Sequence, residues 1–268
     1  MQSCPSVKQK VVHVLRRAGL LSAAESLYFL YQLVTHWRTN RDFLHSHPGF
    51  VAPPAAAMHD AYGSISLAVY LMRGEQIAQY FADIIRRYVP EPKSVLEWGC
   101  GPARVLRHMP EMFPDAKLYG SDYNAASIDW AKKALPGIAF CLNRLSPPLD
   151  FTQGMFDAAY AISVLTHLSQ AQQAIWVAEL RRVVRTGGVI IVTTHGEASS
   201  SAVLLPEEKA QLAREGMIVR EGVREGKRCY LSYHDPRWVR EHLFKGLEIC
   251  DHIPDNPATG QDVWVLRN

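Results

Sequence analysis

The chain has 268 residues, of which 48% are hydrophobic and 21% charged, and its formal net charge at pH 7 is +3. This composition is typical of a globular protein, and the small charge without long Lys/Arg runs argues against a nucleic-acid partner. No apolar run approaches the roughly 18 to 20 residues that a transmembrane helix requires. Five scattered cysteines without a C-x-x-C pair favour a reducing, cytoplasmic setting over a disulfide scaffold or a zinc ribbon.

The N-terminal third of the chain is predicted to be helical. Residues 26–37 (SLYFLYQLVTHW) are apolar around much of a helix, so we expect that helix to be buried. Ser22 and Glu25 have the spacing of a capping box ahead of it. A second helical stretch, residues 64–88, is expected to break near Gly74, because glycine weakens a helix interior.

Residues 8–17 have the pattern of a short basic amphipathic helix. Two roles stay open for the N-terminal helices. They either cap a ligand pocket, or they make a homodimer contact or a weak membrane-surface contact through the basic face. That face would consist of Lys8, Lys10, Arg16 and Arg17.

From residue 94 onward, short apolar runs alternate with helix-forming segments. This alternation predicts a parallel sheet with helices on both faces. Asn124 is a suitable N-cap, and Ser169 with Gln172 has capping-box spacing. The expected strands are 94–98, 117–121, 138–143, 156–162 and 188–194, and the expected helices are 103–109, 124–134 and 169–185.

After residue 195 the strand–helix rhythm changes. We expect a helix over 203–214, a hairpin formed by 217–222 and 228–233, a helix over 236–243, and final strands over 246–252 and 261–267 that pair antiparallel. The predicted organisation is therefore a helical extension or cap over residues 1–90 and one ligand-binding domain over 91–268, with an insertion at about 200–235.

The most informative stretch is SVLEWGCGPARVLRHM, residues 94–109. An apolar strand leads into a turn at Gly99 and Gly101 and then into helix-compatible residues, so backbone N–H groups can face a ligand at the carboxyl edge of a parallel sheet. A dinucleotide fingerprint would need a third glycine where Arg104 stands, which argues against a nicotinamide cofactor. Asp122 ends the second strand and suits ribose hydroxyls, although it could instead cap the helix that follows.

Four segments between residues 94 and 196 resemble, in order, the motifs of class I S-adenosylmethionine-dependent methyltransferases. They are SVLEWGCGPAR, GSDYN, FDAAYAISVLTHLS and ELRRVVRTGGVIIVTTHG. A narrower resemblance is to bacterial methyltransferases of cell-surface polysaccharide and glycosyl-transfer loci, which have similar EWGCGPAR, PPL and SVxTHLS strings. The resemblance implies a Rossmann-like α/β fold: a seven-stranded, doubly wound sheet whose last strand is antiparallel, with a helical N-terminal extension and a hairpin insertion after the fifth strand.

The resemblance also implies a cofactor, S-adenosyl-L-methionine, with S-adenosyl-L-homocysteine as product. Glu97 matches the acid that fixes the amino end of the donor, Asp122 the ribose-binding acid, and Asn143 the position that holds the adenine amino group. Ala103 departs from the family at a position where many members have a third glycine. The residues expected to bind the cofactor are Glu97, Gly99, Cys100, Gly101, Asp122, Tyr123, Asn143, Ile162 and Ser163.

Two histidines follow strand ends that open onto the same crevice. His167 follows the fourth strand and His195 the fifth. A base acting on a hydroxyl acceptor is worth ~10²–10⁴-fold, so both are candidates, with His167 ranked first. Each could instead have a purely structural role as a helix cap or a loop contact. His59, Tyr62 and His234 are candidate substrate contacts, and no metal site is predicted.

The function expected from these features is methyl transfer to a hydroxyl of a sugar or sugar-containing small molecule, such as a glycan acceptor, by a cytoplasmic, bacterial enzyme. The alternative is O-, N- or C-methylation of another small natural product. A nicotinamide-dependent oxidoreductase and a non-catalytic scaffold on a methyltransferase fold are more remote alternatives.

Overall fold

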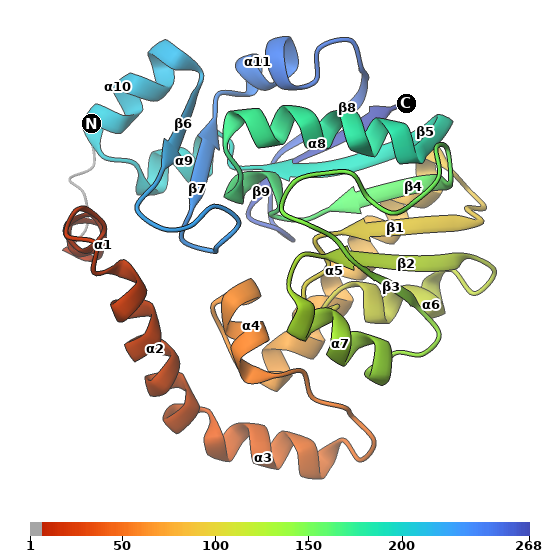
Figure 1. Cartoon of the computed structure of the whole chain (residues 1–268), viewed down its shortest axis with the longest axis horizontal. Helices are drawn as coiled ribbons and strands as arrows, with labels where there is room; N and C mark the ends of the chain where they lie inside the picture. Colours follow the sequence, from red (N-terminus) through yellow and green to blue (C-terminus); the bar gives the residue numbers. More distant parts are fainter. Residues whose placement is uncertain (1–6) are drawn as a thin grey trace.

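The computed structural model of the chain describes residues 7–268, and side chains from residue 11 onward. Its centre is a seven-stranded sheet in the order β3-β2-β1-β4-β5-β9-β8 (Figure 1). β1 to β5 are parallel, and β9 enters antiparallel between β5 and β8. The strands are β1 (Ser94–Trp98), β2 (Lys117–Asp122), β3 (Ala139–Leu142), β4 (Phe156–Ala161), β5 (Val184–Thr194), β8 (Glu248–Asn256) and β9 (Gln261–Arg267). The predicted fold class is confirmed.

Both faces of the sheet are covered by helices. Successive residues of a strand point to opposite faces, and here apolar residues occupy successive positions, so each face is buried. Val95 packs with the helices of one face, and Leu96 with those of the other. The first layer contains α5 (Leu67–Tyr88), α6 (Met109–Met112) and α7 (Ala125–Ala134), and the second contains α8 (Gln170–Val183), the short α11 (Pro236–Trp238) and the π-helix η3 (Val239–Leu243). The carboxyl ends of the parallel strands therefore stay open at one edge.

The N-terminal helices form an arm beside this core (Figure 1). They are α1 (Val7–Arg17), α2 (Leu21–Thr35), α3 (Trp37–Ser46) and α4 (Ala55–Tyr62). The expectation that the apolar helix over 26–37 is buried is wrong: Val34 is 80% exposed, Leu27 67% and Tyr31 62%. The cause is that α2 turns its polar side inward, where Gln32 is 2% exposed and bonds to backbone groups of Gly63 and Ile65.

The capping box expected at Ser22 and Glu25 does not form. The helix already begins at Leu21, and its cap residue Leu20 has no side-chain cap bond. The Glu25 carboxylate instead pairs with the guanidinium of Arg228, which lies in a loop far along the chain. A long-range ion pair has displaced the local interaction.

α5 runs without a break through Gly74, contrary to expectation. A Cβ at this position would lie 2.1 Å from the carbonyl oxygen of Arg104. The glycine therefore permits close contact between α5 and the segment after β1, and packing offsets its low helix propensity.

The helix expected over 103–109 is also wrong in detail. Ala103 has φ +52°, which ends any helix at that point, and its amide bonds to the carbonyl of Cys100 in a turn. The chain continues as the 3-10 helix η1 (Leu106–His108) and then as α6. This left-handed conformation is one that glycine adopts more readily than alanine.

After β5 the chain inserts α9 (Glu197–Val203), α10 (Pro206–Glu215) and an antiparallel hairpin of β6 (Met217–Arg220) and β7 (Leu231–His234). The loop between the hairpin strands, residues 221–230, extends towards the open edge of the central sheet. It is called the hairpin loop below. Within residues 7–268, no helix combines the length and the apolar character that crossing a bilayer requires.

Candidate active site

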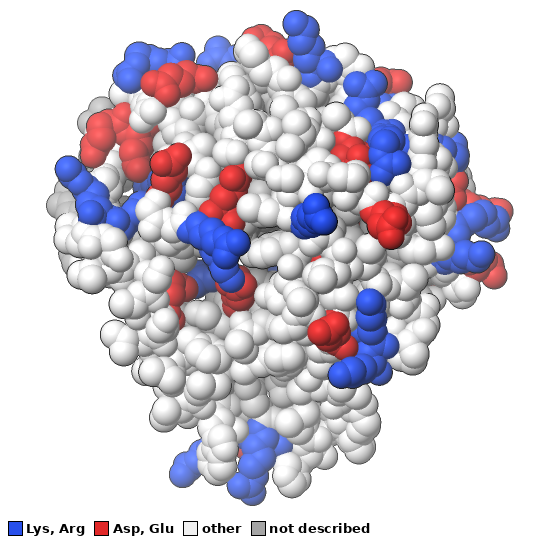
Figure 2. Space-filling view, in the orientation of Figure 1, with Lys and Arg blue, Asp and Glu red and all other residues white. Residues whose placement is uncertain are grey.

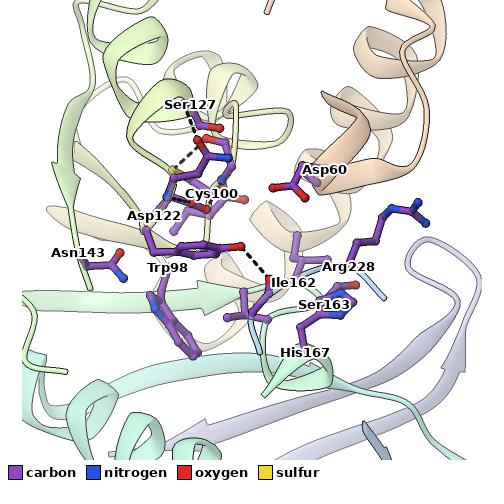
Figure 3. Close-up of a pocket in the computed structure, with 18 of the residues that line it drawn as sticks. Asp60, Trp98, Cys100, Asp122, Ser127, Asn143, Ile162, Ser163, His167 and Arg228 are labelled. Carbon is purple, nitrogen blue, oxygen red and sulfur yellow. Dashed lines mark hydrogen bonds between the residues drawn. The ribbon is translucent and has the colours of Figure 1, made fainter. Parts of the chain in front are cut away.

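A pocket lies at the carboxyl ends of β1, β2 and β4, under the hairpin loop (Figure 3). Every residue that the sequence predicts to bind the cofactor lines this one pocket. These residues are Glu97, Gly99, Cys100, Gly101, Asp122, Tyr123, Asn143, Ile162 and Ser163. Four segments far apart in the sequence, at the ends of β1, β2, β3 and β4, therefore converge here, as expected for a switch point of an open α/β sheet.

The glycine turn after β1 is shaped by close packing. Gly99 has φ +73°, and a Cβ on it would lie 2.2 Å from the side chain of Val164. The turn is anchored by Asp122, whose Oδ2 accepts a hydrogen bond from the Gly101 amide at 2.7 Å. Glycine at position 99 thus allows the turn after β1 to pack directly against the segment after β4.

Asp122 is a pocket carboxylate, not a helix cap. Asn124 is the N-cap of α7, and its side chain accepts from the Ser127 amide. The second carboxylate oxygen of Asp122 accepts from the Asn124 amide at 2.7 Å. Burial raises the pKa of Asp122, while backbone hydrogen bonds from Asn124 and Gly101 oppose that rise. Each carboxylate oxygen keeps a further lone pair that can accept from a ligand hydroxyl.

Glu97 lies at the floor of the pocket and is 4% exposed. Burial raises its pKa to about 8, although the Tyr160 hydroxyl donates to its Oε2 at 3.0 Å. A nearby ammonium group would favour the charged carboxylate. Glu97 is therefore placed to bind a cationic ligand group, and its own charge depends on that ligand.

Asn143 carries an acceptor that the protein does not use. Its Nδ2 donates to the Arg144 carbonyl at 2.6 Å, which fixes the orientation of the amide. Its Oδ1 is buried and has no hydrogen-bond partner among residues 7–268. A buried unpaired acceptor is costly, so this atom fits a ligand N–H such as an exocyclic amine. The glycine turn, the carboxylate at Asp122 and this amide together suit an adenosine-containing donor.

The hairpin loop closes the pocket. Tyr123 donates from its hydroxyl to the Gly226 carbonyl at 2.9 Å, and the Gly226 amide donates to the His167 carbonyl at 3.0 Å. Lys227 pairs with Asp60 of α4 at 2.9 Å. The insertion and the N-terminal arm therefore meet directly above the pocket.

His167 lies in the 3-10 helix η2 (Leu165–His167) and lines the pocket. Its Nδ1 lies 2.8 Å from the carbonyl oxygen of Tyr230. Because a carbonyl only accepts, Nδ1 carries the proton and Nε2 keeps a lone pair. Burial lowers the pKa of His167, and the bond to Tyr230 partly offsets this, so the imidazole is neutral at pH 7.

The other two histidines near strand ends do not line the pocket. His195 bonds through Nδ1 to the Ser232 carbonyl at 2.9 Å and stacks on Tyr233, and burial lowers its pKa to about 4. His234 is 1% exposed, so it is a core residue and not part of a surface lid. Its Nε2 lies 3.0 Å from Gln173 Oε1, and burial lowers its pKa to about 3. The structure therefore brings only His167 to the predicted donor site.

The remaining candidates separate between two cavities. Tyr62 lines the pocket at the ends of β1, β2 and β4, and its hydroxyl accepts a hydrogen bond from the Arg104 amide at 3.2 Å. His59 lines an adjoining outer cavity, which lies between α2, α4 and the hairpin loop. Asp60 and Arg228 line both cavities and so form the neck between them.

Several residues of the site were not expected from the sequence. Arg104 lines the pocket, with its guanidinium 3.9 Å from the centre of the Tyr62 ring, and Trp98 lines the wall and packs against Trp176 with its ring tilted by 30°. Arg228 comes from the hairpin loop, where the charged run REGKR surrounds a glycine. In the sequence, this charged run was the one feature that could have indicated that the hairpin loop contributes to a site.

Comparisons with known proteins agree with this geometry. Residues 95–188 match the family model described as a methyltransferase domain. An uncharacterized methyltransferase of Schizosaccharomyces pombe is 29% identical over 114 residues, or 39% of this chain and 40% of that protein. A malonyl-[acyl-carrier protein] O-methyltransferase of Legionella pneumophila is 27% identical over 111 residues, or 39% and 37% of the two chains. The chain thus spans about two fifths of the length of these curated relatives.

Among solved structures, a similar fold occurs in an amino pentose methyltransferase of Micromonospora echinaspora, solved with S-adenosylmethionine bound. The TM-score is 0.54 at 19% identity, over 73% of this chain and 92% of that one. Residues 95–188 therefore resemble a methyltransferase domain, and the chain shares the fold of a methyltransferase that was solved with S-adenosylmethionine bound.

Proposed function

We propose that the chain catalyses methyl transfer from S-adenosylmethionine to a hydroxyl of a sugar or sugar-containing small molecule. The observation that carries the proposal is a single pocket that holds both a nucleoside-type cradle and a neutral histidine. S-adenosylmethionine, when bound, supplies a methyl group already activated on a sulfonium centre. Asp122 would hold the ribose hydroxyls, Asn143 Oδ1 the adenine amino group and Glu97 the ammonium group.

His167 is the proposed base. Its Nε2 would take the proton of the acceptor hydroxyl as the bond from oxygen to the methyl carbon forms and the bond from that carbon to sulfur breaks, which leaves S-adenosylhomocysteine as the neutral thioether product. The Tyr230 carbonyl holds the ring in the required tautomer and stabilises the imidazolium that results. Much of the remaining catalysis would come from alignment of the acceptor with the methyl group.

The acceptor would enter through the outer cavity. Its wall mixes the carboxylates of Glu25 and Asp60 with the basic groups of Lys227 and Arg228, and such a lining suits a polar molecule with several hydroxyls. An amino pentose methyltransferase and a malonyl-[acyl-carrier protein] O-methyltransferase are among the similar proteins. A sugar amine is therefore the second candidate for the nucleophile. A cytoplasmic location and the domain division at residue 90 stay predictions.

The first test is calorimetry of the full chain with S-adenosylhomocysteine and, separately, with NAD. Binding of the former alone is expected, and binding of NAD alone would overturn the proposal. The second test is transfer of a labelled methyl group to a panel of nucleotide sugars, free sugars and amino sugars. Donor binding without transfer to any hydroxyl or amine would favour a non-catalytic scaffold.

A further inference from the structure

Helix α2 exposes a stripe of apolar side chains to solvent and buries the polar Gln32, whereas a helix beside a core normally does the opposite. Leu27, Leu30, Tyr31 and Val34 have the spacing that forms one stripe along a helix, and this stripe faces solvent. We call the exposed apolar side chains of α2 and the start of α3 the arm face. It comprises Leu27, Tyr28, Leu30, Tyr31, Leu33, Val34 and Trp37, which are 39% to 80% exposed.

The arm cannot simply roll to bury this face. The opposite side of α2 is held by specific polar contacts: Glu25 pairs with Arg228, and Gln32 bonds to the Gly63 carbonyl and the Ile65 amide. Rolling the helix would break these bonds and expose the outer cavity that α2 lines. A stripe this long on a fixed helix indicates a surface that is covered by something else.

The charges around the arm face indicate what covers it. Residues 7–46 contain two acidic residues, and Glu25 is already paired inward. Arg38 and Arg41 are exposed next to the stripe, and the Arg41 guanidinium lies 5.6 Å from the ring of Trp37. Among the described side chains of this segment, the exposed Lys and Arg residues are Arg17, Arg38 and Arg41, and the exposed acidic residue is Asp42.

Figure 2 shows the surface over α2 and α3 as mostly uncharged, with basic groups at its tip. A second copy of the chain packed by a two-fold axis that passes near Arg38 and Arg41 would bring these groups together, at a cost in repulsion. An anionic lipid surface would instead attract them. Tryptophan and tyrosine beside arginine are also the side chains that favour a bilayer interface.

We propose that the arm face of α2 and α3 docks the protein onto an anionic bilayer surface, with the apolar stripe among the headgroups and Arg38 and Arg41 on the lipid phosphates. The basic face first expected for this role needs revision. Arg16 points inward, where its guanidinium donates to the carbonyls of Arg220, Glu221 and Cys229. The side chains of Lys8 and Lys10 lie outside the described residues. Because α2 also lines the outer cavity, docking places that cavity about one helix diameter (~10 Å) from the bilayer.

The test is flotation of the full chain with phosphatidylcholine vesicles and with vesicles that also contain phosphatidylglycerol. The protein is expected to bind the anionic vesicles and to be released as salt is raised. The double variant Leu27→Gln/Val34→Gln should bind them at least ~10-fold more weakly, since it removes two apolar side chains from the interface. Arg38→Glu/Arg41→Glu should lose the preference for anionic lipid.

Matched controls come from exposed residues outside the arm face. Ile175, which is 45% exposed on α8, serves as Ile175→Gln, and Arg214, on α10, serves as Arg214→Glu. Both should bind like the parent chain, and circular dichroism should show all variants folded. Failure of the parent chain to bind anionic vesicles would overturn the proposal. So would equal loss in arm and control variants, or a stable dimer in light scattering that only the arm variants dissociate.

Discussion

The Nδ1 atom of His167 lies 2.8 Å from the carbonyl oxygen of Tyr230, a residue that reaches the site on the hairpin inserted after β5. This contact assigns the proton to Nδ1 and leaves Nε2 as the atom able to accept one. The insertion therefore does more than cover the pocket, because it selects the tautomer of the proposed base.

Replacement of His167 by alanine should lower kcat by ~10²–10⁴-fold, the usual worth of a general base. The affinity for S-adenosylhomocysteine should change little, since the proposed polar contacts to the donor, from Glu97, Asp122 and Asn143, lie on other segments. Steady-state kinetics and calorimetry on the same preparation measure the two quantities. His195→Ala is the matched control, because His195 lies outside the pocket lining, and it should keep kcat within a few-fold if it folds. Unchanged turnover in the His167 variant would remove this residue from the mechanism.

The same histidine predicts the acid side of the pH profile. Burial lowers the pKa of His167, so the neutral form persists below the ordinary value of 6.5. The rate should therefore stay level as pH falls from 8 through about 6.5 and decline only at lower pH. The measurement is kcat/KM for the acceptor at saturating S-adenosylmethionine, which keeps Glu97 in its donor-bound state, across pH in buffers of constant ionic strength. An acid limb centred above 6.5 would contradict the assignment of this group as the base.

Asn143 offers a test of donor recognition through one atom. Its free Oδ1 should accept from the adenine amino group, a hydrogen bond worth about 0.5–1.5 kcal/mol. The variant Asn143→Leu should thus bind S-adenosylhomocysteine up to ~10-fold more weakly. S-inosylhomocysteine, which has a carbonyl where adenine has its amino group, provides the control ligand. The parent chain should prefer the adenine form and the variant should not; equal discrimination by both proteins would assign Asn143 no role in base recognition.

The sheet and the donor pocket could be predicted from sequence because their determinants are local. Short apolar runs, the turn at Gly99 and polar residues at strand ends each lie within a few residues of the structure that they specify. The errors have a common cause in long-range contacts. Gly74 does not break its helix because the Arg104 carbonyl packs against it, and Glu25 does not cap a helix because Arg228 binds it.

The acceptor side was the least predictable part for the same reason. Asp60 and Arg228 are 168 positions apart in the sequence (228 minus 60), yet both line the neck between the two cavities. No local pattern marks such a pair. For α2 the sequence correctly predicted an apolar helix but wrongly predicted that the helix is buried. Periodicity alone does not tell whether an apolar stripe packs against the same chain or faces solvent.

Glu97 should make the ligand-free protein less stable as pH rises. Its pKa is raised from 4.5 to about 8 in the folded chain, so the folded state binds an additional proton between these values. Stability should therefore decline as pH increases from about 4.5 towards 8, and the contribution of Glu97 should be fully lost above that pH. Thermal unfolding from pH 6 to 9 measures this, and Glu97→Gln should flatten the decline, because a glutamine cannot ionise.

A bound ammonium group favours the charged carboxylate of Glu97, so S-adenosylhomocysteine should cause the release of a proton when it binds near pH 7. Calorimetry in two buffers of different ionisation enthalpy detects that proton. A parent chain and a Glu97→Gln variant with the same slope of melting temperature against pH, and with no difference in proton release, would show that Glu97 is already ionised without ligand.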